Sequence, residues 1–364
     1  MNVCIIGEGL TALSLAKSLI NKKINVHYYH KSRNSNFSSN RTIGISKSNF
    51  EFFKEKIFQI SKNNYWKINR IEIYTDKIDT ENLLKFENDK NDLFYIIKND
   101  ELLKSLNSNL IKSKFFKKII LKKDINEESL NKKEYDLIIN CDANNFLAKK
   151  YFTKKISKNY YNLAYTTILK HKKIENNTAT QIFTKQGPIA FLPISNTETS
   201  VVYSMDIKNK KFDNSDVIDL INKNNPKYQI NKIDKLNSFE LSSSNLRNYH
   251  HKNILAFGDM LHRVHPLAGQ GFNMTIRDLR ILTKIIEDKI ELGMQLDSLI
   301  LDEFEKKTKD KNFVFSKAID LIYESFNLDK KVQNKSFSKI LKSIGKNKNL
   351  NNYFIKLADT GINF

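Results

Sequence analysis

The stretch NVCIIGEGLTALSLA, residues 2–16, decides the fold of this chain. Its apolar run VCII is typical of a short buried strand, and GEGLTA is a glycine-containing turn. Leu13, Ala16 and Leu19 then recur at helical spacing, and INVHYY, residues 24–29, is a second strand-like run. A strand, a helix and a strand within about thirty residues form a βαβ unit, which predicts a parallel sheet and an α/β fold.

The turn of this unit carries the pattern G-x-G-x-x-A, made by Gly7, Gly9 and Ala12. Gly7 allows the tight turn, Gly9 lets the backbone approach a pyrophosphate, and the small Ala12 lets the helix pack closely on the strand. The start of the following helix attracts the negative charge of a phosphate. The pattern predicts a dinucleotide site, and the alternative is an ordinary strand-to-helix turn.

His30 stands where such sites usually have an acidic residue that holds the ribose, about 20 residues beyond the turn. His30 or Ser32 can form a hydrogen bond with a ribose hydroxyl instead. The alternative is that His30 is a surface residue at the end of a strand.

Two later apolar runs end in an aspartate: YDLIINCD (135–142) and NILAFGD (253–259). They predict buried parallel strands that deliver a polar side chain at their carboxyl ends. Residues 160–248 contain β-rich stretches between turn residues, which predict a mostly antiparallel second sheet. From about residue 272 the spacing is helical, with one apolar face formed by Phe272, Ile276, Leu279, Leu282 and Ile286.

A second glycine cluster, GDMLHRVHPLAGQGFNM, covers residues 258–274, although the chain has only ten glycines. Gly258 permits close approach of a ligand, and Asp259 can accept hydrogen bonds from its hydroxyl groups. Gly269 and Gly271 free backbone N–H groups at a helix start. We therefore expect a planar, polar cofactor to contact the backbone here.

Four residues could suggest a metal site or a disulfide. His262 and His265 have H-x-x-H spacing, but no further Cys, His or acidic ligands lie at suitable spacing, so we predict no metal site and assign both to the cofactor loop. Cys4 and Cys141 lie in apolar runs and are expected in the core, unpaired.

The formal net charge is +21. A charge of this size fits nucleic acid or an anionic membrane surface, or simply lysine as the default surface residue. Basic and aromatic residues do not interleave as in RNA-binding signatures, so no nucleic acid is expected. No apolar run approaches the ~18 residues of a membrane span, and no signal peptide is predicted. We expect a cytoplasmic protein that is soluble or peripheral on the inner face of the membrane.

The 258–274 stretch, with the Arg-Asp pair that follows it, closely resembles the flavin-contacting signature of the FAD-dependent aromatic hydroxylases similar to para-hydroxybenzoate hydroxylase. Within them it resembles the ubiquinone-biosynthesis monooxygenases. The resemblance extends over most of the chain through motifs in the same order: NRTIGIS (40–46), WKINRIEIY (66–74), IIKNDELLKSL (96–106), AYTTILKH (164–171), GPIAFLPI (187–194), SFELS (238–242) and KLADTG (356–361).

The resemblance implies an α/β fold with a Rossmann-like, GR2-type FAD-binding domain, an interleaved, mostly antiparallel β-sheet substrate domain and a helical C-terminus. The FAD-binding domain would comprise residues 1–62, 92–158 and 249–290. The substrate domain would comprise residues 63–91 and 159–248, and the helical region residues 291–364.

The resemblance also implies roles for individual residues. Gly7, Gly9 and Ala12 would bind the ADP half of FAD, and His30 takes the place of the ribose ligand. Pro266 would lie over the isoalloxazine ring, with His265 beside it as the second catalytic residue. The other implied cofactor-binding residues are Arg41, Asp142, Gly258, Asp259, Gly269, Gln270, Gly271, Phe272 and Asn273. Arg41 has the alternative of an ordinary surface arginine.

One motif departs from the family pattern. The family's D-G with a following Ser and Arg helps to bind both flavin and reduced nicotinamide, whereas this chain has CDANNFLAKK, in which Asp142 is kept and Ala143, Phe146 and Lys149 replace the expected types. The departure bears on reduction by NADPH more than on FAD binding.

The implied activity is hydroxylation of the aromatic ring of a polyprenylated phenol in ubiquinone biosynthesis, by O₂ through a flavin hydroperoxide. NADPH or another electron donor would be the reductant. Anionic membrane and other ubiquinone-synthesis proteins are further expected partners. The floor of the substrate pocket is expected to contain Ala164, Phe183, Phe191 and Leu192.

Two other activities stay open: a flavoprotein reductase of isoprenoid double bonds, and a non-catalytic FAD-binding subunit of a ubiquinone-synthesis complex. A flavin-dependent halogenase is excluded, because its W-x-W-x-I-P motif needs two tryptophans and the chain has only Trp66.

Overall fold

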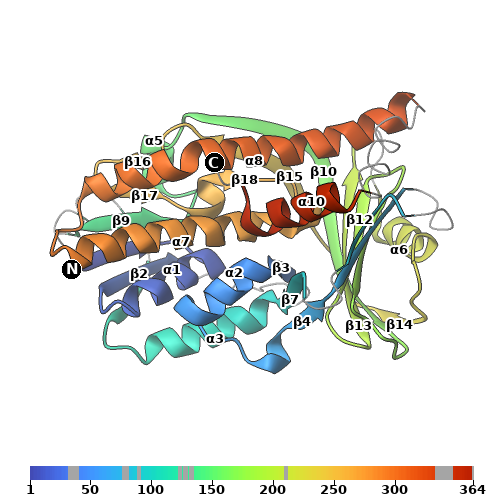
Figure 1. The fold of residues 1–364 in the computed structure, drawn as a ribbon, viewed down its shortest axis with the longest axis horizontal. Coiled ribbons are helices and arrows are strands. Elements are labelled where there is room, and N and C mark those ends of the chain that lie inside the picture. The colour runs from blue at the N-terminus through green and yellow to red at the C-terminus, as the bar shows by residue number, and fades with distance from the viewer. Residues whose placement is uncertain are drawn as a thin grey trace.

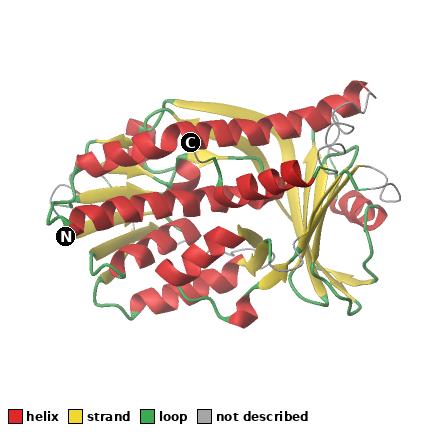
Figure 2. Ribbon diagram, in the orientation of Figure 1, coloured by secondary structure: helices red, strands yellow, loops and turns green. Residues whose placement is uncertain are grey.

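The computed structural model describes residues 1–31, 41–75, 82–87, 92–121, 125, 130, 135–208, 212–332 and 347–362. Ser32, named above as a ribose ligand, lies outside these residues. The two layers expected from the sequence are present: a mostly parallel sheet with helices packed on it, and beside it a larger, mostly antiparallel sheet (Figure 1). Figure 2 shows the helices gathered along the first sheet and the strands of the second at the other end of the molecule.

The first sheet has six strands in the order β16-β17-β9-β1-β2-β8. All neighbouring strands in it are parallel except β16, which pairs antiparallel with β17 at the edge. The strands are β1 (Asn2–Ile6), β2 (Asn25–Lys31), β8 (Phe116–Leu121), β9 (Leu137–Asn140), β16 (His250–His251) and β17 (Ile254–Ala256). β1 and β9 read as continuous apolar runs because helices cover the sheet.

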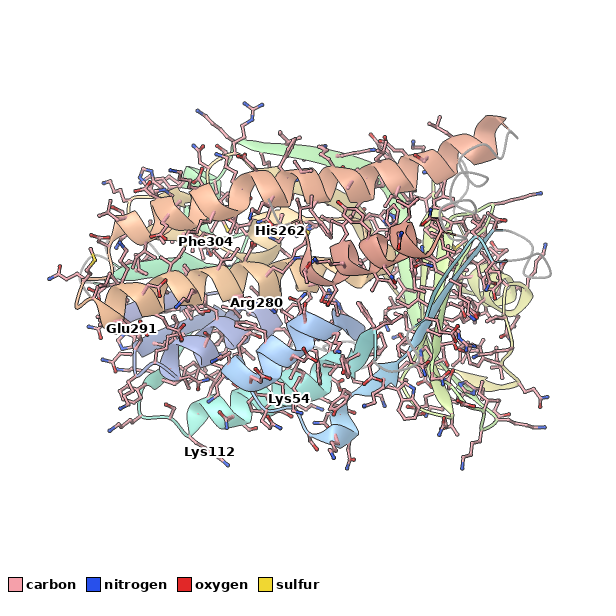
Figure 3. The ribbon with its side chains drawn as sticks, in the orientation of Figure 1. Lys54, Lys112, His262, Arg280, Glu291 and Phe304 are labelled. Atoms are coloured by element: carbon pink, nitrogen blue, oxygen red, sulfur yellow. The ribbon has the colours of Figure 1, made fainter. Side chains whose placement is uncertain are left out.

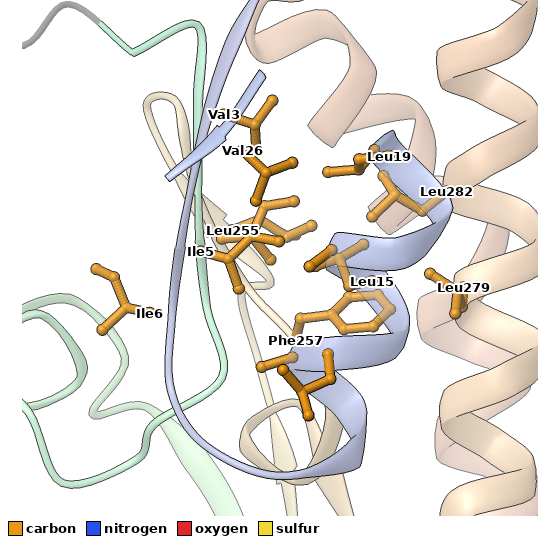
Figure 4. Packing of buried hydrophobic residues seen from close by; sticks show 14 of the residues in the cluster. Val3, Ile5, Ile6, Leu15, Leu19, Val26, Leu255, Phe257, Leu279 and Leu282 are labelled. Atoms are coloured by element: carbon orange, nitrogen blue, oxygen red, sulfur yellow. The ribbon is translucent and has the colours of Figure 1, made fainter. Parts of the chain in front are cut away.

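Helix α1 (Leu10–Ile20) lies between this sheet and α7 (Gln270–Glu291), as Figure 4 shows. Leu15 and Leu19 of α1 contribute to one buried cluster with Val3 and Ile5 of β1, and Leu282 of α7 closes it from the other side. The apolar face predicted for α7 is confirmed, since Ile276, Leu279, Leu282 and Ile286 are at most 1% exposed and Phe272 packs against the same cluster. The other described helical elements before residue 155 are α2 (Lys47–Phe52), η1 (Phe53–Ile57), η2 (Lys62–Asn64), α3 (Asn99–Ile111) and α5 (Phe146–Tyr151).

The second sheet has nine strands, with β18-β15-β10-β13-β12-β11-β5-β6 in order and β14 paired to β10. Among its described strands only β5 and β11 pair in parallel. Helix α6 (Asn214–Lys223) packs on its outer face. The strands are β5 (Arg70–Thr75), β6 (Leu84–Glu87), β10 (Lys155–His171), β11 (Thr178–Phe183), β12 (Pro188–Pro193), β13 (Glu198–Asp206), β14 (Ile230–Ile233), β15 (Asn237–Leu246) and β18 (His262–Arg263).

A small sheet, β3-β7-β4, lies between the two large ones. Its strands are β3 (Thr42–Ser46), β4 (Trp66–Ile68) and β7 (Phe94–Lys98). Helix α8 (Ser298–Val332) contacts β16 of the first sheet and β18 of the second, and α10 (Lys348–Thr360) packs against α2. None of the helices in the described ranges is long and apolar enough to cross a bilayer.

Candidate functional site

Three loops meet at the carboxyl edge of the parallel sheet, where α/β proteins bind their ligands. They follow the neighbouring strands β1, β9 and β17. Backbone hydrogen bonds hold them together: Cys141 N donates to Ile6 O at 2.7 Å, and Phe257 N donates to Asn140 O at 2.9 Å. The loops therefore bring the first glycine turn, Asp142 and Asp259 to one edge of the sheet, as the sequence patterns predict.

The close approach of these loops requires glycine at two positions. A Cβ on Gly7, whose φ is +139°, would lie 2.9 Å from Cβ of Cys141. A Cβ on Gly258, with φ +69°, would lie 2.5 Å from Cγ2 of Thr11 in the first turn of α1. Both backbone angles are ones that side chains with a Cβ rarely adopt. Gly7 thus joins the β1 and β9 loops, and Gly258 brings the β17 loop against α1.

The two aspartates of this edge differ in their bonding. Asp142 accepts a hydrogen bond from Asn144 N at 2.9 Å, while the neighbouring loop is fixed by paired amide hydrogen bonds between Asn140 and Asn145. Asp259 is exposed, on the short η3 helix (Gly258–Met260). Burial, followed by the charges of Asp259 and Asp142, raises the pKa of the Cys141 thiol. Cys141 is half-buried, neither Cys4 nor Cys141 takes part in a disulfide, and the Cys141 thiol stays protonated.

His30 lies at the carboxyl end of β2, next to the Gly7 turn, because Gly7 N donates to Tyr29 O at 3.0 Å. Its ring stacks on Tyr28 at 5.6 Å and its Nδ1 lies 3.1 Å from Lys31 O. Its Nε2 is buried and has no hydrogen-bond partner among the described residues. Burial, then the charge of Lys118, lowers the pKa of His30, so the ring is neutral at neutral pH and its Nε2 can bond with a hydroxyl.

This edge fits the phosphates and ribose of FAD. Gly9 is the N-cap of α1 and no side chain caps the helix, so N–H groups of its first turn are available to phosphate. A Cβ on Gly9 would meet no atom within 4 Å, so the turn borders open space. Together with the unpartnered His30 Nε2, these groups are the donors that a pyrophosphate and a ribose need.

The second half of the site is the loop before α7, which lies against β3. Gly269 has φ +63° and is the N-cap of α7, after the short η4 helix (Leu267–Gly269). The buried Asn273 side chain ties this loop to β3: its Nδ2 donates to Gly44 O at 2.9 Å and to Gly269 O at 3.0 Å, and its Oδ1 accepts from Ser46 N at 2.9 Å. Asn273 therefore fixes the loop through its side chain, a role that sequence spacing did not indicate.

Further members of the predicted set lie around this loop. Pro266 is half-buried, Gln270 is buried and Gly271 and Phe272 occupy the first turn of α7. Ala12 is fully buried where α1 meets the sheet. Arg41 is exposed at the start of β3, with its Cζ 6.0 Å from the centre of the Phe239 ring on β15.

His265 is buried in a polar layer between the loop and the antiparallel sheet. Its Nε2 lies 3.2 Å from Ser204 Oγ on β13, and its ring stacks on Tyr323 of α8 at 4.2 Å. The Tyr160 ring meets it edge-on at 5.0 Å, and the Tyr160 hydroxyl donates to Asp320. Burial, with a smaller effect from the charge of Lys158, lowers the pKa of His265 to about 3. The imidazole is therefore neutral, and no sequence pattern indicated its tyrosine partners.

His262 has different neighbours, so the two histidines do not form a pair. Its Nε2 lies 2.5 Å from Asp278 Oδ2 on α7, and Asn312 of α8 donates to Asp278 Oδ1 at 2.9 Å. No cluster of three His, Cys, Asp or Glu side chains that could hold a metal occurs in the described ranges.

The expected pocket floor needs a correction. Phe191 faces the outer side of the antiparallel sheet, where it packs with Tyr203 and with Val217 of α6. Its neighbour Leu192 faces inward, because successive side chains of a strand point to opposite faces. Phe183 and Ala164 are also inward, but Phe326 of α8 stacks on Phe183 at 3.4 Å and Tyr323 packs against Ala164. The four residues do not form one surface.

A different row of side chains on the inner face of the sheet is only partly covered. Gln181, Ala190, Val202 and Thr166 are register partners across β11, β12, β13 and β10. On β13 this row lies between Ser204, which contacts His265, and Ser200, which accepts a hydrogen bond from Thr42 Oγ1 of β3 at 2.8 Å. Gln181, Ala190 and Val202 are only half-buried. The row thus faces the space between the two arms of the site, β3 and the loop before α7.

Comparison with known proteins agrees with this geometry. A family model described as an FAD binding domain matches residues 158–307. The mitochondrial ubiquinone biosynthesis monooxygenase COQ6 of Caenorhabditis elegans is 24% identical over 80% of this chain and 78% of its own length. The 3-demethoxyubiquinol 3-hydroxylase of Escherichia coli is 29% identical over 40% of this chain and 39% of its own.

Solved structures share the fold over the whole chain. The p-nitrophenol 4-monooxygenase PnpA of Pseudomonas putida superposes with a TM-score of 0.77 at 12% identity, covering 100% of this chain and 98% of its own. HpxO of Klebsiella pneumoniae, solved with FAD and uric acid, gives a TM-score of 0.76 at 13% identity, covering 99% and 97%. With its flavin signature, its two-sheet fold and these relatives, the chain is similar to FAD-dependent monooxygenases, and among curated proteins to the ubiquinone biosynthesis monooxygenases.

Proposed function

We propose that this chain is an FAD-dependent monooxygenase that hydroxylates the aromatic ring of a polyprenylated phenol during ubiquinone biosynthesis. The observation that carries the proposal is the pair of glycine loops, one at the uncapped start of α1 and one before α7, of which the second borders the half-buried inner row of the antiparallel sheet. The division into FAD-binding, substrate-binding and helical segments at the boundaries given above is part of the proposal.

In this proposal the N–H groups around Gly9 hold the pyrophosphate, His30 holds the ribose, and Arg41, Asp142 and Asp259 border the same edge. The backbone from Gly269 to Asn273 holds the flavin ring, with Pro266 against it. FAD, when bound and reduced, activates O₂ for transfer of one oxygen atom to the phenol.

The protein's part is positioning and the exclusion of water. Asn273 fixes the loop against β3, and Thr42–Ser200 and His265–Ser204 fix the sheet against both arms. Ala190 and Val202 offer an apolar surface for the phenol ring, with the Gln181 amide beside them to bond with a ring substituent. The neutral His265 holds the cofactor loop against β13 through Ser204 without adding a charge.

The reductant in this proposal is NADPH or another electron donor. Single-turnover mixing of the oxidised protein with NADPH, followed at the flavin absorbance band, tests it: bleaching with NADPH supports direct reduction. A flavin that bleaches only with dithionite or a separate reductase points to another donor, as the changed CDANNF segment would allow.

The lipid-soluble substrate also motivates a membrane surface. Val314, Leu321 and Leu328 repeat every seven residues on one side of α8 and are 44%, 64% and 59% exposed, with the exposed Lys317 among them. Apolar residues flanked by cations suit the interface of an anionic bilayer. We include peripheral binding to the inner face of the membrane, alongside other ubiquinone-synthesis proteins, in the proposal. Co-sedimentation with vesicles that does not increase with acidic lipid would contradict the membrane part.

The decisive experiment combines a spectrum with complementation. The purified protein should be yellow with bound FAD, and its expression in strains that each lack one ring hydroxylase should restore ubiquinone in one of them. A protein that binds FAD but neither complements any strain nor forms product with NADPH would favour the non-catalytic subunit. NADPH consumption without O₂ would favour the reductase of isoprenoid double bonds.

A further inference from the structure

Three cationic side chains surround a cavity of about 150 Å³ at the junction of α7, α8 and the end of α10. Arg277 and Arg280 come from α7, Lys311 comes from α8, and Thr360 and Gly361 close the cavity from α10. Figure 1 shows these three helices side by side on one side of the molecule. None of the residues assigned to FAD lines this cavity.

Arg277 is the most unusual of the three cations. No hydrogen bond joins its guanidinium to any residue that the structure describes, and its Nη1 is buried without a partner. The group lies over the Phe315 ring, with Cζ 4.4 Å from the ring centre. Gly361, with φ +77°, lets the chain close over it, since a Cβ there would be 3.0 Å from Arg277 Nε. Burial lowers the Arg277 pKa to about 10.

Arg280 is only partly satisfied by the protein. Its Nη2 donates to Ser48 O of α2 at 2.8 Å, and its Cζ lies 4.7 Å from the Phe52 ring centre. Its Nε is buried without a hydrogen-bond partner among the described residues. Figure 3 shows Arg280 beside α7, toward α2. Both arginines thus hold donors that are unused by the described chain, which is a costly arrangement for a buried polar group.

The nearby carboxylates do not satisfy these donors. Asp278 is the acidic residue of the lining, and its two oxygens already bond with His262 and Asn312. Asp359 lies close enough to raise the pKa of both arginines, but its Oδ1 accepts from Ser48 N at 2.8 Å. Three cations against these two carboxylates leave the junction positively charged.

We propose that this cavity is a binding site for a phosphate group, held by the guanidinium groups of Arg277 and Arg280 and the ammonium of Lys311. Guanidinium donors bind phosphate in pairs, and a dianion matches three converging cations better than a carboxylate does. The bound group would fasten α10 to α7, one turn beyond Asn273 and the cofactor loop. It comes from inorganic phosphate or from a phosphate ester of a nucleotide.

Isothermal titration calorimetry on the FAD-saturated protein tests the proposal, because saturating FAD fills the pyrophosphate site at Gly9. One arm uses inorganic phosphate and the other uses 2′-AMP, with ionic strength held constant by chloride. Saturable binding in the phosphate arm identifies the free ion as a ligand, and binding only of 2′-AMP identifies a nucleotide ester. No saturable heat from either ligand up to roughly 10 mM, a weak affinity even for small ligands, overturns the proposal.

Variants of the lining residues test whether they hold the phosphate. Lys311→Met should weaken binding about tenfold, as expected for loss of one charge-assisted contact. Lys306→Met, at an exposed position on the same helix, is the matched control and should leave binding unchanged. Arg277→Lys keeps the charge but loses the paired donors and should weaken binding further. Equal affinities in wild type and Lys311→Met would place any bound phosphate elsewhere and contradict the assignment.

Discussion

His262 Nε2 lies 2.5 Å from Asp278 Oδ2, and neither side chain is more than 1% exposed. The contact joins β18, directly before the segment 264–269 that leads into α7, to the third turn of α7. Since Asn312 bonds with the other carboxylate oxygen, three elements share one buried carboxylate. The pair therefore fixes both ends of the loop that is expected to hold the flavin ring.

His262→Ala should lower the free energy of unfolding by about 3 to 5 kcal/mol, because it leaves a buried carboxylate without its main partner. Urea denaturation followed by far-UV circular dichroism measures the loss in the free energy of unfolding. His251→Ala, at a half-buried position on β16, is the control. A loss no larger than that of the control would show that the pair does not stabilise the loop.

Gly7→Ala should reduce both stability and FAD content, since the new Cβ would lie 2.9 Å from Cys141 Cβ and the φ of +139° is strained. Gly293→Ala is a matched control, because Gly293 also has a positive φ of +68° but a Cβ there would meet nothing within 4 Å. The control should cost only about 1 kcal/mol of backbone strain and keep its flavin. Equal flavin-to-protein absorbance ratios in the two variants would contradict the role of close approach at Gly7.

The sequence predicted those parts of the site that depend on local pattern. The Gly7–Gly9 turn, the aspartates after β9 and β17, and the apolar face of α7 follow from spacing within about twenty residues, and the structure brings them to the expected edge. The surroundings of His265 could not be predicted this way, because Tyr160 and Tyr323 come from distant strands and helices. Phe191 and Leu192 are a different case: strand alternation already separates them, so one of the two could not belong to the pocket floor.

The stability of the protein should depend on His265 in mildly acidic solution. Its pKa is lowered to about 3 in the fold and returns to about 6.5 in the unfolded chain. Between these values the unfolded state binds a proton that the folded state does not, so stability rises with pH through this window. The slope is up to about 1.4 kcal/mol per pH unit from this residue. Chemical denaturation at pH 4.5, 5.5 and 7 should show a smaller slope in His265→Gln, and an unchanged slope would contradict the assignment.

Filling the inner row of the antiparallel sheet should block the substrate without removing the cofactor. Val202 is half-buried on that face, midway along β13 between Ser200 and Ser204, and Val202→Phe adds bulk where the phenol ring is expected. We expect FAD content to stay at the wild-type ratio while the KM for the phenol rises about tenfold or more, the effect of losing a few buried methylene contacts. Leu292→Phe places a ring at a 73% exposed position at the end of α7 and should leave KM unchanged. An unchanged KM in Val202→Phe would contradict substrate binding at this row. A phenol bound there could not fit beside the added ring.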